Sequence, residues 1–167
     1  MAEPWTTPEL SHTWSIHEIQ DPLAFLSFVF DIAPRSSRWI ICGAPQQVVD
    51  RLAPFALPRG KRPWFYLGFA QPPLVIPLPD DREAIRRTLA TVPIELLIEQ
   101  HVYAGGKAIL VSYDNLSCCW LTQDVPRDTM GTVGARVGFR FAESAAAQQG
   151  DAPDEVRAGN ESRGPRR

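Results

Sequence analysis

Apolar and polar residues follow patterns along the chain that predict individual strands and helices. Residues 13–19 alternate in the manner of a half-buried strand, and residues 38–42 form a short apolar run that indicates a buried strand. Between them, residues 22–30 are apolar on nearly every side of a helix, so they predict a buried helix. Asp21 precedes this run as an N-cap and Pro22 takes its first position, and both residue types favour a helix start there.

Three shorter or weaker helices are predicted further along the chain. The first covers residues 45–53 and ends at Pro54. The second covers residues 80–92 and has acidic residues at its start, where they interact favourably with the positive end of the helix. The third begins at Pro126 and is weakened by two glycines.

Prolines recur throughout residues 54–79. Because proline removes a donor from a strand ladder, this stretch is expected to be extended or looping, with room for a short edge strand at 63–70. A last strand is predicted at residues 137–141, close to the end of the apolar part of the chain.

Residues 94–122 contain the strongest strand signal. Gly105-Gly106 and Asp114-Asn115 each offer a two-residue hairpin turn between apolar runs. These turns predict a three-stranded meander with strands at about 94–104, 107–113 and 116–122. Together with the helices, the meander predicts an α+β fold, in which a largely antiparallel sheet has helices packed on one face.

Two-residue turns also predict which residues face each other. They pair Ala104 with Lys107 in the first hairpin and Tyr113 with Leu116 in the second. Neighbouring residues of a strand point to opposite faces of the sheet. A slip of one residue in the strand pairing would therefore move each side chain to the other face.

The two adjacent cysteines fall on opposite faces in this register. Cys118 belongs to the apolar face, where a free thiol behaves as a small hydrophobe. Cys119 shares a face with His101, but Leu110 of the central strand lies between them, and their backbones are about 9–10 Å apart. A nucleophile and its base must lie within hydrogen-bond reach, so both residues are interpreted as part of the sheet's packing.

The predicted elements form one domain over residues 12–142, preceded by an N-terminal extension at 1–11. Residues 143–167 contain no aromatic residue and one branched apolar residue, Val156, so they predict a disordered tail. Hydrophobic residues make up 44% of the chain and charged residues 22%, which is typical of a soluble globular domain. The formal net charge of −2 gives no basic excess, so no nucleic-acid partner is expected.

The sequence contains no pattern for export, membrane insertion or metal binding. No basic segment with an apolar core opens the chain, and no apolar run approaches the roughly 20 residues that span a bilayer. Three cysteines without framework spacing suit a reducing compartment, so a cytoplasmic protein without membrane contact is expected. The cysteines and histidines lack zinc-ligand spacing, and no phosphate-binding motif occurs, so neither a metal nor a cofactor is predicted.

Residues 58–66 are the strongest candidate for a binding surface. Basic and aromatic side chains follow one another there in a turn rich in Gly and Pro, and Trp, Tyr and Arg dominate protein interfaces. The candidate residues are Arg59, Lys61, Arg62, Trp64 and Tyr66. The alternative interpretation is a solvated basic turn that leads into a strand anchored by Trp64.

Two hypotheses for the function follow. Since no catalytic group of residues passes the geometric test, the first is a non-catalytic protein that acts through contact with a protein partner. Its size and charge fit adaptor subunits or immunity proteins, by an analogy that transfers no residues. The second is a small-molecule-binding protein or enzyme that uses the His101 face of the sheet. Its pocket residues are Glu99, His101, Tyr103, Ser112 and Cys119.

Overall fold

The strands of the protein form one antiparallel sheet. The computed structural model describes residues 12–58 and 73–144, and the seven strands in these ranges lie in the order β3-β2-β4-β5-β6-β1-β7. Every neighbouring pair is antiparallel. The strands are β1 (Thr13–His17), β2 (Arg38–Cys42), β3 (Leu74–Pro77), β4 (Glu99–Ala104), β5 (Lys107–Tyr113), β6 (Cys118–Thr122) and β7 (Arg140–Glu143).

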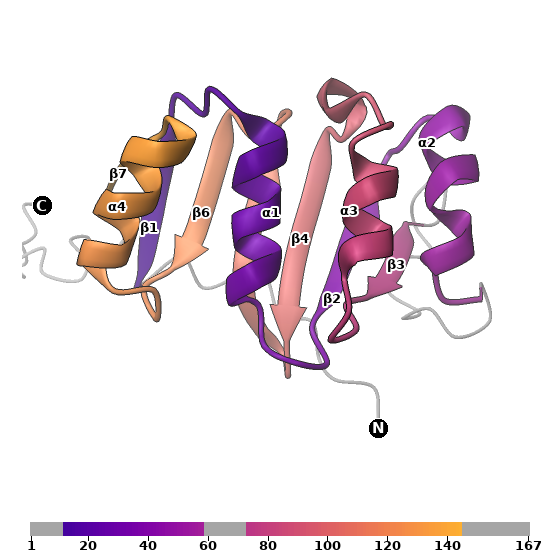
Figure 1. The fold of residues 1–167 in the computed structure, drawn as a ribbon, viewed down its shortest axis with the longest axis horizontal. Helices are drawn as coiled ribbons and strands as arrows, with labels where there is room; N and C mark the ends of the chain where they lie inside the picture. Colours follow the sequence, from indigo (N-terminus) through magenta and orange to yellow (C-terminus); the bar gives the residue numbers. More distant parts are fainter. Residues whose placement is uncertain (1–11, 59–72, 145–167) are drawn as a thin grey trace, which may run out of the picture.

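The helices of the described ranges lie over one face of this sheet (Figure 1). They are α1 (Pro22–Ile32), α2 (Gln46–Leu52), α3 (Glu83–Leu89) and α4 (Arg127–Val137), with 3-10 turns η1 (Ala53–Phe55) after α2 and η4 (Ile94–Leu96) before β4. The predicted α+β fold, with a three-stranded meander and helices on one face, is confirmed. No helix in these ranges has the length and apolar character that crossing a bilayer requires.

Helix α1 packs its aromatic side chains against the sheet and against the C-terminal part of the domain. The Asp21 carboxylate accepts a hydrogen bond from the Ala24 N–H at 2.9 Å, so the predicted N-cap is confirmed. The Phe30 ring meets Trp39 of β2 edge-on at a centroid distance of 5.1 Å. Burying a side chain of this size contributes about 2–3 kcal/mol, so the apolar run that predicted the helix also supplies much of the core.

Strand β3 lies where the prolines predicted extended or looping chain. It pairs with β2 through Trp39 opposite Ile76, and it is the edge strand of the described sheet. Pro77 is tolerated because it is the last residue of an edge strand, where no ladder donor is needed on one side. The strand predicted at 63–70, the extension at 1–11 and residues 145–167 of the predicted tail lie outside the described residues.

One extra residue in β5 shifts the register of the first hairpin. Ala104 faces Lys107 as predicted, but Val102 faces Leu110 rather than Ile109. Ile109 therefore forms a β-bulge, and both Ile109 and Leu110 belong to the core on the helix-covered side. The predicted β4–β5 register beyond this point is wrong. A slip of one residue places the later side chains of β5 on the opposite face of the sheet relative to those of β4.

The second hairpin turn is centred one residue later than predicted. Asn115 and Leu116 occupy its two central positions, with positive φ angles of 55° and 68°. The Ser117 N–H closes the turn by donating to the Asp114 carbonyl at 3.0 Å. The predicted pairing of Tyr113 with Leu116 is therefore wrong. Positive φ strains a leucine, but the Leu116 side chain is buried in the core, and this burial offsets the strain.

The bulge in β5 exchanges the environments predicted for the adjacent cysteines, whereas the later turn moves their β5 partners by two residues and keeps their faces. Cys119 is buried in the core on the helix-covered side, whereas Cys118 is exposed and faces Tyr113 on the opposite side of the sheet. His101 faces Val111, which lies on the same side as Tyr113. The prediction that Cys119 shares a face with His101 is therefore wrong, and the cysteine on that face is Cys118.

The buried side chain of Arg82 joins the end of α1 to the start of α3. Its guanidinium donates hydrogen bonds to the main-chain carbonyls of Phe30, Ala33 and Pro34, the last two at 2.9 and 3.1 Å, and its Nε donates to the Pro79 carbonyl at 2.8 Å. The last carbonyls of a helix lack partners within the helix and favour a positive charge. Arg82 therefore supplies both the hydrogen bonds and the charge that the end of α1 needs.

We expect Arg82→Met to destabilise the protein by about 2–4 kcal/mol, because it leaves several buried carbonyls without donors. Chemical denaturation followed by tryptophan fluorescence measures this change. Arg87→Met is the matched control: Arg87 is exposed and pairs with Glu83 on the surface of α3, so its loss should change stability by less than about 0.5 kcal/mol. Equal effects of the two substitutions would contradict the role given to Arg82.

Candidate functional site

The face of the sheet opposite the helices carries a row of polar and aromatic side chains. His101 lies within it, between Ile40 of β2 and Val111 of β5. The His101 Nε2 donates a hydrogen bond to the Glu99 Oε1 at 3.0 Å, and the buried Nδ1 has no hydrogen-bond partner in the part of the chain that the structure describes. The His101 side chain is 6% exposed and that of Glu99 is 31% exposed, so the carboxylate is the more solvent-facing member of the pair.

The structure brings together three of the five residues predicted for a ligand pocket. Glu99, His101 and Tyr103 alternate along β4 on the face opposite the helices. Ser112 and Cys119 face each other across β5 and β6 on the helix-covered side, where both are buried. The bulge in β5 separates the two groups, because beyond it the residues of β5 change sides relative to β4.

Aromatic rings extend the row from β4 toward β6. The His101 ring meets Tyr113 edge-on at 5.2 Å and Tyr103 at 6.2 Å. The Tyr113 ring in turn meets Trp120 at 6.3 Å. The sequence did not predict Tyr113 or Trp120 as site residues, because the bulge that brings Trp120 to the His101 side falls at an isoleucine, with no glycine to indicate it.

Burial controls the protonation of this row. It lowers the pKa of His101, although the hydrogen bond and the charge of Glu99 act in the opposite direction. Burial raises the pKa of Tyr103 to about 12, with the neighbouring Tyr113 as a second cause. It also raises the pKa of the Cys42 thiol to about 12, and the charge of Glu99 adds to this shift. A reactive cysteine must be a thiolate, so Cys42 is not an activated nucleophile at neutral pH.

The predicted basic and aromatic loop lies outside the described residues, and its role in binding stays a prediction. Its members are Arg59, Lys61, Arg62, Trp64 and Tyr66. The described chain ends on one side of this loop at position 58 and resumes at position 73, immediately before β3.

Two large apolar side chains are exposed in the described ranges, and both lie at one end of the sheet. Ile98, just before β4, is 50% exposed, and Tyr113, the last residue of β5, is 38% exposed. The Asn115 N–H donates to the Ile98 carbonyl at 3.1 Å, which holds the β5–β6 turn against the start of β4. Ile98, Tyr113 and the turn at 114–117 are named here the sheet-end patch.

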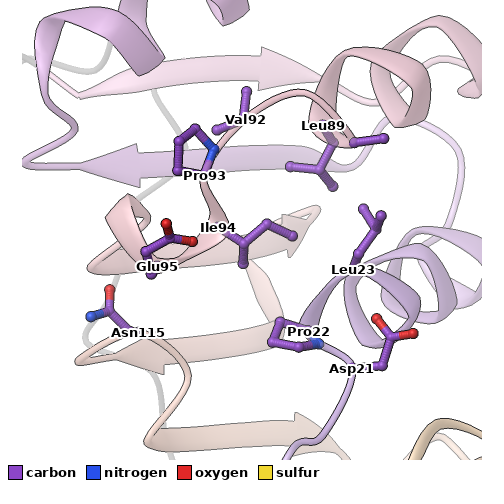
Figure 2. Close-up of a pocket in the computed structure, with 10 residues that line it drawn as sticks. Asp21, Pro22, Leu23, Leu89, Val92, Pro93, Ile94, Glu95 and Asn115 are labelled. Atoms are coloured by element: carbon purple, nitrogen blue, oxygen red, sulfur yellow. The ribbon is translucent and has the colours of Figure 1, made fainter.

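A cavity of about 420 Å³ lies beside this patch on the helix side of the sheet. Figure 2 shows its walls, which come from the first turn of α1, the segment after α3 and the β5–β6 turn. Most of the lining side chains are apolar. The lining residues are Asp21, Pro22, Leu23, Leu89, Ala90, Val92, Pro93, Ile94, Glu95 and Asn115.

Comparison with known proteins gives no relative from which a role can be carried over. The sequence matches no protein-family model, and neither the curated proteins nor the solved structures include a significant match. Among residues 12–58 and 73–144, no cluster of three or more His, Cys, Asp or Glu side chains is arranged to hold a metal ion.

We expect His101→Gln to remove part of the pH dependence of folding. The folded protein holds the pKa of His101 below its ordinary value of 6.5, so the unfolded chain binds this proton more tightly. The resulting stabilisation is complete above about pH 6.5 and is lost as the pH falls from there toward the folded-state pKa. Urea unfolding between about pH 8 and about pH 5 should therefore show a smaller loss of stability in the variant than in the wild type.

His17→Gln provides the control for this measurement, because His17 is an exposed histidine on β1, a strand that does not border β4. This variant should keep the pH dependence of the wild type. If His101→Gln also keeps the pH dependence of the wild type, the buried imidazole is not a source of that pH dependence.

We expect Cys118 to be alkylated at least about tenfold faster than the other two cysteines in the native protein, because it is exposed while Cys42 and Cys119 are buried. Burial also raises the pKa of both buried thiols, which lowers their reactivity further. Brief treatment with iodoacetamide followed by peptide mass spectrometry measures the three rates. The three rates should converge only when urea unfolds the protein. Similar rates in the native protein would contradict the burial of Cys42 and Cys119.

Proposed function

We propose that the protein is a non-catalytic binding protein that acts through contact with a protein partner, and that the sheet-end patch is its contact surface. The observation that carries this proposal is that the two exposed large apolar side chains of the described ranges, Ile98 and Tyr113, lie at the same end of the sheet. Single exposed apolar residues are ordinary on protein surfaces, but two at the same end of one sheet favour an interaction site there.

The composition of the patch supports contact with a protein. Tyrosine is enriched among the residues that contribute most to protein interfaces, because it combines a large apolar ring with a polar tip. The ring of Tyr113 is held edge-on between His101 and Trp120, so little conformational freedom remains to be lost on binding. Glu95 and Asp114 add exposed negative charges at the rim.

The protonation of the buried groups favours binding over nucleophilic catalysis. The raised pKa values of Cys42 and Tyr103 keep both groups neutral, and Cys118, the exposed thiol, lies beside Tyr113 rather than beside a buried base. A binding surface requires only shape, apolar area and matched polarity, all of which the sheet-end patch offers.

We expect Ile98→Asp and Tyr113→Asp each to weaken partner binding at least about tenfold, because each places an unpaired charge in an apolar contact. Tagged full-length wild type and variants would be used for affinity capture from an extract of the source cells, and the captured proteins would be quantified by mass spectrometry. The proposal requires one protein that the wild type retains in stoichiometric amount and that both variants lose.

Gln47→Asp is the matched control, since it adds the same charge at an exposed position on α2, away from the patch. It should capture the partner as the wild type does, and thermal unfolding should show that all three variants are folded. Equal capture by the wild type, Ile98→Asp and Tyr113→Asp would overturn the role of the patch, as would the absence of any protein specific to the wild type.

A further inference from the structure

We propose that the cavity in Figure 2 receives an arginine side chain of the partner protein, with its guanidinium placed between Glu95 and Asn115. The assignment of this arginine to a partner protein rests on the proposed function. The preference of the cavity for a guanidinium is independent of the proposed function, because it follows from the residues that line the cavity.

The walls of the cavity fit the aliphatic part of a long side chain. Ile94 lies in the middle, and Leu23 of α1 and Leu89 of α3 approach it from the other side (Figure 2). Lysine and arginine bury their methylene groups along apolar surfaces of this kind while the charged head stays near water. The volume of about 420 Å³ lies within the range of pockets that hold small molecules, so it has room for one side chain.

The charge of the lining favours a cation over an anion. No lysine, arginine or histidine is among the lining residues, whereas two carboxylates are, Asp21 and Glu95. The Asp21 carboxylate is already used, because it accepts the Ala24 N–H and neutralises the positive end of α1. Glu95 is exposed and has no hydrogen-bond or ion-pair partner among the described residues, so it supplies the free negative charge of the cavity.

The position of Asn115 favours a guanidinium over an ammonium. Figure 2 shows the side chains of Glu95 and Asn115 at the same end of the cavity, opposite the end that holds Asp21. A guanidinium presents five N–H donors in a rigid plane, so it can bind a carboxylate and a neighbouring amide oxygen at once. The backbone of Asn115, which belongs to the sheet-end patch, is fixed by the hydrogen bond from its N–H to the Ile98 carbonyl.

Blocked amino acids test this proposal without the partner. The probes are N-acetyl-arginine methylamide, the neutral isostere N-acetyl-citrulline methylamide, and N-acetyl-lysine methylamide, each titrated into the isotope-labelled full-length protein and followed by NMR. The arginine probe should cause saturable shifts at the amides of Leu23, Ile94 and Asn115. Its affinity should exceed that of the citrulline probe roughly tenfold, since only the guanidinium forms a charge-assisted hydrogen bond with Glu95.

Glu95→Gln should reduce the affinity for the arginine probe roughly tenfold and leave that for the citrulline probe unchanged. Glu83→Gln is the matched control, because Glu83 is an exposed glutamate at the start of α3 that does not line the cavity. Equal binding of the arginine and citrulline probes, equal binding of the arginine and lysine probes, or shifts confined to other amides would each overturn the proposal.

The two proposals can fail separately. If the arginine probe binds as expected while the Ile98 and Tyr113 variants keep their partner, the cavity recognises a guanidinium but the sheet-end patch is not the contact surface. If the variants lose their partner while the arginine probe does not bind, the patch is the contact surface and the assignment of the cavity is wrong.

Discussion

The β-bulge at Ile109 determines what each face of the sheet contains. Leu110 faces Val102 and Ile109 is the extra residue, and both side chains enter the core beneath the helices. Beyond this point the residues of β5 have changed sides relative to β4. His101 consequently lies in one row with Val111, and Cys119 is buried in the core. A sheet with one helix-covered face tolerates such a change only where an extra apolar residue can be buried on the covered side.

The end of the sheet that carries both proposed sites depends on the hairpin turn that follows the same strand. Leu116 takes a left-handed conformation so that its side chain can enter the core, and this shifts the turn by one residue. Asn115 then points its N–H toward the carbonyl of Ile98, which links the turn to the start of β4. One turn thus holds Tyr113 on one side of the sheet and Asn115 beside the cavity on the other.

Burial and charge have different roles on the two sides of this end. On the face opposite the helices, burial keeps the thiol of Cys42, the phenol of Tyr103 and the imidazole of His101 uncharged near neutral pH, and the charge of Glu99 acts on all three pKa values. On the helix side, the cavity is apolar with a free carboxylate at its rim, Glu95. Both arrangements suit recognition, because neither places an activated nucleophile beside a base.

The sequence alone determined the elements that depend on local patterns. Asp21 and Pro22 began α1, the apolar run after them predicted a buried helix, and Gly105-Gly106 set the first turn of the meander, because caps, turns and periodicity are properties of neighbouring residues. Only the tertiary structure decided which side chains share a face. The bulge at Ile109 and the buried Leu116 are stabilised by helices distant in sequence, so no local pattern indicates them, and a shift of one residue reassigned every candidate site beyond β4.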